Sequence, residues 1–99
     1  MNNRDIIKSI DNIMLCIQAL IKMRFNKRTK IIYSKGRYRS AHISFCKNPY
    51  VWRFYCEDQV SHYMLYLLKD DRIIRKDFIK KEELVNQFYT KLNYFFRYI

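Results

Sequence analysis

Residues 29–56 read TKIIYSKGRYRSAHISFCKNPYVWRFYC, and this stretch decides the fold. It is rich in β-branched and aromatic residues, which favour β-strands, and it contains the only glycine and the only proline of the chain. We therefore predict strands near residues 29–34, 38–46 and 50–56. Gly36 is expected to supply a positive φ in the first turn. Asn48 and Pro49 fit the first two places of a type I turn.

The alternation of side chains predicts how the second and third strands pair, because successive residues of a strand point to opposite faces. The two apolar sets are Ala41, Ile43 and Phe45, and Trp52, Phe54 and Cys56. They meet on one face only if Ile43 lies opposite Phe54, which requires a loop of two or four residues. The other face then carries a polar and aromatic set: Tyr38, Ser40, His42, Ser44, Arg53 and Tyr55. Alternation does not decide whether Ile31 or Ile32 faces the core.

A helical period precedes the strands. Residues 4–25 carry apolar side chains at alternating spacings of four and three, which predicts a helix with one buried stripe. We expect Asn3 to cap this helix and Asp5 to lie in its first turn, where the helix dipole favours an acid. The stripe consists of Ile6, Ile7, Ile10, Ile13, Met14, Ile17, Leu20 and Ile21.

Further helices are predicted after the strands. Residues 58–71, DQVSHYMLYLLKDD, are expected to form a helix with one apolar side: Val60, Tyr63, Met64, Leu67 and Leu68. Residues 80–99 are expected to form another, whose inward side chains are Leu84, Val85, Phe88, Tyr89, Leu92, Phe95 and Phe96. The segment RIIRKDFI, residues 72–79, fits either a short strand or a continuation of the preceding helix.

The order of these elements predicts one α+β domain that spans residues 1–99. It would contain an N-terminal helix, an antiparallel meander of three or four strands, and one or two C-terminal helices packed on one face of the sheet. The scarcity of Gly and Pro, one of each, argues against linkers within this domain.

Positive charge is concentrated in one segment. The net charge is +11, and residues 22–39 alone contain eight Lys or Arg and no acid. Such a balance favours an acidic partner such as nucleic acid. Three simpler explanations compete with it. Cations stabilise the C-terminal end of a helix, charge at a hairpin end prevents edge-to-edge pairing, and a composition typical of A/T-rich codons raises the Lys content.

We predict a small basic protein that is not an enzyme and that binds nucleic acid mainly through phosphates, with little sequence specificity. Arg37 and Arg39, with Tyr38 between them, are expected to contact phosphates and to stack on a base or sugar. The candidate binding residues are Arg24, Lys27, Arg28, Lys30, Lys35, Arg37, Tyr38, Arg39, Arg53 and Tyr55. The alternative is a protein-interaction factor, such as an inhibitor of a host protein, with no nucleic-acid role.

The motif search gives no sign of a catalytic centre, a metal or a cofactor. His42 and Cys46 are about 13 Å apart along one strand, too far to share a zinc ion. One glycine is too few for a phosphate-binding loop. The acids occur as neighbouring pairs (Glu57-Asp58, Asp70-Asp71 and Glu82-Glu83), which we place where helices begin or end. The three cysteines, Cys16, Cys46 and Cys56, form no close pair and are expected to be buried free thiols.

The chain shows no secretory signal and no run of about 20 apolar residues, so we expect an intracellular protein with no membrane span. The isoleucine stripe of the first helix would also suit pairing between two chains, which makes a homodimer a further prediction.

In length and composition the whole chain resembles small basic proteins of filamentous and rod-shaped viruses that infect hyperthermophilic archaea. The residues behind this resemblance are the opening MNNRDIIKSIDNIM, the Tyr- and Arg-rich hairpin, and the close NYFFRYI. The resemblance implies a viral, thermostable protein in a hot host cytoplasm. It assigns no site residue.

Overall fold

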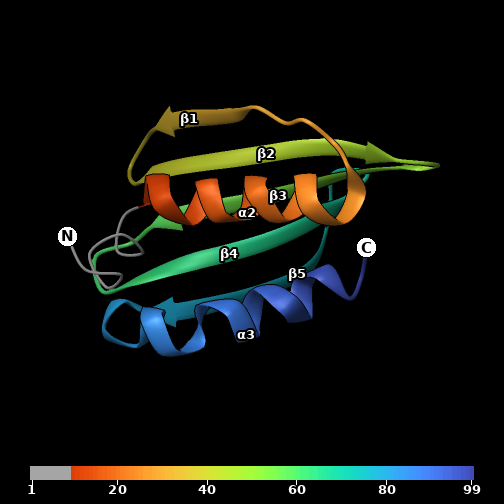
Figure 1. The fold of residues 1–99 in the computed structure, drawn as a ribbon. Helices are drawn as coiled ribbons and strands as arrows, with labels where there is room; N and C mark the ends of the chain where they lie inside the picture. The colour runs from red at the N-terminus through yellow and green to blue at the C-terminus, as the bar shows by residue number, and fades with distance from the viewer. Residues whose placement is uncertain (1–9) are drawn as a thin grey trace.

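The computed structural model describes residues 10–99, and it places two helices against one sheet (Figure 1). Helix α2 (Ile10–Phe25) is followed by five strands and then by a short 3-10 turn, η1 (Lys81–Glu83), that leads into helix α3 (Leu84–Phe96). The strands are β1 (Ile31–Lys35), β2 (Arg39–Lys47), β3 (Tyr50–Asp58), β4 (His62–Lys69) and β5 (Arg72–Lys80). The predicted start of the first helix, with Asn3, Asp5, Ile6 and Ile7, lies outside the described residues.

The sheet is an antiparallel meander in the order β1-β2-β3-β4-β5, so each strand pairs with its neighbours in sequence. The α+β class and the arrangement of an N-terminal helix, a meander and a C-terminal helix are confirmed. The sheet has five strands rather than three or four. Residues 72–79, which the sequence left undecided, belong to β5.

The helix predicted over residues 58–71 is wrong, because most of this segment forms β4. Tyr63, Leu65 and Leu67 point inward and alternate with Met64, Tyr66 and Leu68, while Val60 lies in a turn and is 90% exposed. A continuous apolar run fits both periods, and pairing with β3 and β5 decides for the strand. Asp70 and Asp71 join β4 to β5 with φ of 49° and 64°, the conformation of a two-residue hairpin turn.

The register predicted for β2 and β3 is confirmed, since Ile43 lies opposite Phe54. The turn between them differs from the prediction. Lys47 pairs with Tyr50, so Asn48 and Pro49 occupy the two central places, joined by a cis peptide. The first turn differs as well. Lys35 pairs with Arg39, so the turn is a three-residue loop, residues 36–38. Gly36 does not have a positive φ in this loop.

Both helices cover the same face of the sheet, and the core lies between them and that face (Figure 1). The core holds the predicted sets of β2 and β3 together with Tyr63, Leu65 and Leu67 of β4. Ile31 packs against this core and Ile32 is exposed, which fixes the side of β1 that the sequence left open.

The helices bury most of the side chains predicted to face inward. In α2 these are Ile10, Ile13, Met14, Ile17 and Ile21, with Leu20 partly buried. In α3 they are Leu84, Phe88, Leu92, Phe95 and Phe96. Tyr89 is an exception, because 51% of it is exposed. The isoleucine stripe is therefore used within the chain, against its own sheet.

Two of the three acid pairs flank strands rather than helices. Glu57-Asp58 closes β3 and Asp70-Asp71 forms the β4–β5 turn, because the segment between them is a strand. Glu82-Glu83 lies in η1, just before α3, as an acid at the start of a helix should. Within residues 10–99 no helix is long and apolar enough to cross a membrane.

Candidate nucleic-acid interface

No described helix covers the second face of the sheet, which we call the open face (Figure 1). The register of the strands assigns its side chains, because residues paired across strands share a face. They include His42 and Ser44 of β2, Arg53, Tyr55 and Glu57 of β3, Met64, Tyr66 and Leu68 of β4, and Ile73, Lys76 and Phe78 of β5.

One row of this face crosses four strands. His42 pairs with Tyr55, Tyr55 with Tyr66, and Tyr66 with Lys76. The rings of Tyr55 and Tyr66 are in contact, with centroids 5.4 Å apart and an interplanar angle of 56°. Neighbouring strands are about 4.8 Å apart, so the row presents rings at intervals that bases can stack on.

Arg53 lies beside this row and is held in place. Its Nε donates to Ser44 Oγ at 3.1 Å, and its Nη2 lies 3.6 Å from Asp71 Oδ1. Arg53 borders an open hollow of about 390 Å³ whose other lining residues are Tyr55, Glu57, Tyr66, Leu68 and Ile73. A guanidinium in this place can contact a phosphate or stack on a base.

Glu57 is the acid of this hollow. Its Oε2 accepts a hydrogen bond from Tyr55 at 3.3 Å, and its Oε1 accepts from Tyr66 at 3.4 Å and from Gln59 at 3.2 Å. The carboxylate is half-buried, and burial together with Glu57 raises the pKa of Tyr66. The hydroxyl of Tyr66 therefore stays protonated near neutral pH.

His42 occupies the β2 end of the row. Burial and the positive charge of Arg53 lower its pKa below the ordinary value of 6.5. The imidazole is consequently neutral at pH 7 and presents a ring without adding charge.

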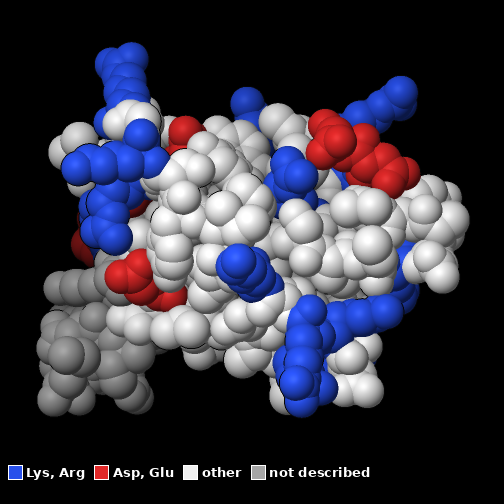
Figure 2. Space-filling model, turned by 90° about the horizontal axis from the view of Figure 1, so that it is seen from above, with Lys and Arg blue, Asp and Glu red and all other residues white. Residues whose placement is uncertain are grey.

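The basic segment 22–39 does not form one surface in the folded chain. Lys27, Arg28 and Lys30 lie in the loop that leaves the C-terminal end of α2, whereas Lys35 and Arg37 lie at the β1–β2 hairpin. Strand β1 separates the two groups by its whole length, and Figure 1 shows the loop from α2 at one end of β1 and the hairpin at the other. In Figure 2, Lys and Arg side chains are spread over the view, at its left and right sides and singly between them, and they form no single patch.

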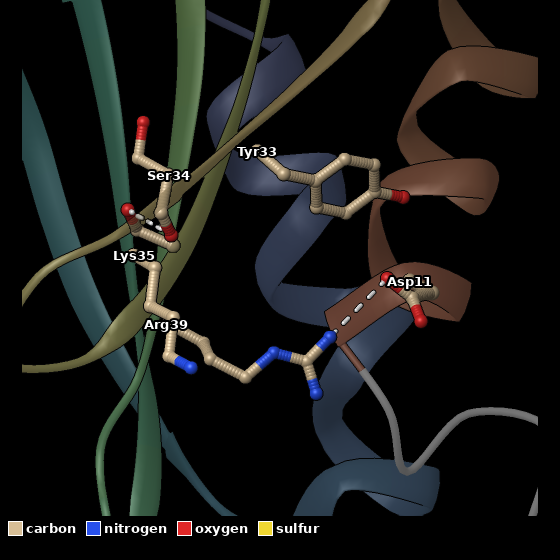
Figure 3. Close-up of a pocket in the computed structure, with 6 residues that line it drawn as sticks. Asp11, Tyr33, Ser34, Lys35 and Arg39 are labelled. Atoms are coloured by element: carbon tan, nitrogen blue, oxygen red, sulfur yellow. Dashed lines mark hydrogen bonds and ion pairs between the residues drawn. The ribbon is translucent and has the colours of Figure 1, made fainter.

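The basic residues at the β1–β2 hairpin make contacts within the chain. Arg39 extends from β2 to Asp11 of α2, with 3.7 Å between Nη2 and Oδ1 (Figure 3). The pair borders a hollow of about 440 Å³ that also contains Tyr33, whose pKa is raised by burial and by Asp11. Arg37 lies over the ring of Tyr38, 5.6 Å from its centroid.

The basic residues of the loop after α2 border another hollow, of about 530 Å³, on the outer side of α2. Lys22, Lys27 and Arg28 line it together with Thr29, whose Oγ1 is buried and has no hydrogen-bond partner among the described residues. Arg24 does not belong to this group. Its Nη2 donates to Asn93 of α3 at 2.8 Å, and its guanidinium lies over Phe96, so it joins the two helices.

Of the predicted binding residues, only Arg53 and Tyr55 lie together on the open face. The sequence also placed their partners His42 and Ser44 of β2 there, but it missed those on β4 and β5. Tyr66, Lys76 and Phe78 belong to β4 and β5, which the sequence had assigned to a helix and to an undecided segment. The sequence carries no clear local signal for them, because residues 63–68 are all apolar or aromatic and fit both the helical and the strand period.

The candidate metal ligands and the cysteines form no site among the described residues. Among residues 10–99, no three His, Cys, Asp or Glu come close enough to hold a metal ion. The described cysteines are free thiols, but only Cys56 is buried, and burial raises its pKa far above the ordinary value. Cys46 is exposed at the end of β2, contrary to the expectation of buried thiols.

A scan against protein-family models and searches of curated proteins and of solved structures gave no match.

Proposed function

We propose that this protein binds single-stranded nucleic acid, with bases stacked on the open face and phosphates held by the Lys and Arg side chains around it. The observation that carries the proposal is the row His42–Tyr55–Tyr66–Lys76, with Arg53 beside it, on a sheet face free of described helices. Aromatic side chains on a sheet are a common platform for unpaired bases.

Charge supports the same proposal. A strand that crosses the open face can reach Arg53 and Lys76 on the face itself. A broad sheet face fits splayed bases better than it fits a duplex groove. Stacking tolerates every base, which agrees with a protein that reads little sequence.

The test compares two pairs of tyrosines by fluorescence anisotropy with a labelled all-thymine oligonucleotide. Replacing Tyr55 and Tyr66 by Ala removes the two rings in contact on the open face. Each stacked base contributes about 1–3 kcal/mol, so the double variant should bind at least about 25-fold more weakly.

The matched control replaces Tyr94 and Tyr98 by Ala. Both are about half exposed on the opposite, helical side of the molecule. The control should bind like the wild type. Equal losses in the two double variants, or no binding by the wild type at low salt, would contradict the proposal.

A second candidate function has an observation in its favour. Four apolar side chains are exposed on the open face, namely Ile32, Val51, Ile73 and Phe78. They favour a protein partner on this face, either a host protein or a second copy of the chain. Light scattering at micromolar concentration, and recovery of one stoichiometric partner after nuclease treatment, would support this function over the first.

A further inference from the structure

Glu57 is the unexpected residue of the open face, because a carboxylate repels the phosphates that the surrounding cations attract. It lies in the same hollow as Arg53, Tyr55 and Tyr66, so a strand stacked on these rings must pass beside it. A phosphate cannot approach Glu57 favourably. A base can, provided that it offers hydrogen-bond donors.

The carboxylate has capacity for such donors. An ionised carboxylate is an acceptor with about four lone-pair positions, and three donors now use them. The bonds from the two tyrosine hydroxyls measure 3.3 and 3.4 Å, whereas the usual O–H···O distance is about 2.7–2.8 Å. These long bonds are weak, so a better-placed donor can replace them.

Guanine is the base that matches this acceptor. Its Watson–Crick edge carries two adjacent donors, N1–H and the N2 amino group, in the spacing of the two oxygens of a carboxylate. Adenine and cytosine each place an acceptor beside their amino group, and thymine and uracil place their single N–H between two carbonyls. Each of these edges leaves an acceptor facing the carboxylate.

We infer that Glu57 accepts both donors of one guanine while a tyrosine of the hollow stacks on the ring. The inference rests on the proposed function and adds a base preference at one position of the bound strand. Arg53 is four residues from Glu57 on the same strand, about 13 Å along it, which places the guanidinium near the neighbouring phosphate rather than the same base. The remaining positions stay tolerant of sequence.

The experiment measures binding of the wild type to four oligonucleotides that are all thymine except for the central base: thymine, adenine, guanine or inosine. A single guanine cannot form a quadruplex, and inosine lacks only the N2 amino group. Guanine should bind about fivefold or more tightly than thymine and adenine, with inosine between them.

Two variants test whether Glu57 is the source of the preference for guanine. Glu57→Gln should lose the preference for guanine, measured as the ratio of the affinities for the guanine and all-thymine strands, because an amide accepts at one position only. Loss of the negative charge should strengthen binding to all four strands alike. Asp58→Asn is the matched control, since Asp58 pairs with Lys81 and does not line the hollow; it should keep the preference. Equal binding of guanine and inosine, or a preference that survives in Glu57→Gln, would overturn the inference and leave the proposed function standing. Failure to bind any of the strands would overturn the proposed function itself.

Discussion

Replacing Phe54 by Ala should destabilise this protein severely. The side chain is 1% exposed, and its ring lies 5.0 Å from that of Phe96 and 6.4 Å from that of Phe95, measured between centroids. Truncating a buried Phe costs about 3–5 kcal/mol through lost burial and the cavity that remains. A domain of this size has a free energy of unfolding of about 5–15 kcal/mol, so the variant should lose a fifth or more of it.

Tyr55 is the control, because it is the next residue of β3 and points to the open face. Its truncation leaves no cavity and breaks one long hydrogen bond, so it should cost about 1–2 kcal/mol. Urea denaturation followed by circular dichroism measures both free energies of unfolding. The melting temperature should fall by about 15–30 °C for Phe54→Ala. A larger loss for Tyr55→Ala would refute the register and the assignment of the two faces.

Two further predictions follow from burial and charge. A thiol reagent should modify the exposed Cys46 in the native protein, whereas Cys56 should react only on unfolding; prompt reaction of both would contradict the burial of β3. Because the folded chain lowers the pKa of His42, the unfolded chain binds a proton there first, so stability should fall as pH drops through about 6.5. Denaturation at pH 7.5 and 5.5 should show a smaller decrease for His42→Gln than for the wild type.

The hairpin of β2 and β3 could be predicted from sequence because two independent signals agree there. The apolar residues alternate strictly, and the only proline marks the turn. The helical stripe of α2 is equally regular. Both patterns are local in the sequence, and the pairing and packing in the folded chain agree with them.

Strand β4 could not be predicted in the same way. Residues 63–68 are all apolar or aromatic, and their Leu and Met favour a helix when no neighbours are considered. What decides for a strand is the pairing with β3 and β5, which is tertiary information. The two consecutive aspartates with positive φ were the local signal of the turn, but Asp at both places is less diagnostic than Asn-Gly or Asp-Gly.

Only the part of the candidate site that lies on correctly predicted strands could be predicted. Arg53 and Tyr55 were placed on the correct face because their strand was correctly predicted. Tyr66 and Lys76 were missed together with their strands. The basic segment appeared continuous because the sequence does not show that β1 carries its two ends apart.

The central claim is that nucleic acid lies on the open face, and chemical-shift mapping by NMR tests it most directly. Amide shifts of the labelled protein would be followed during titration with a short all-thymine oligonucleotide. We predict the largest changes at His42, Tyr55 and Tyr66, with little change at the outer residues of α3, such as Tyr94. Changes confined to the helices, or none at all at saturating oligonucleotide, would contradict this account.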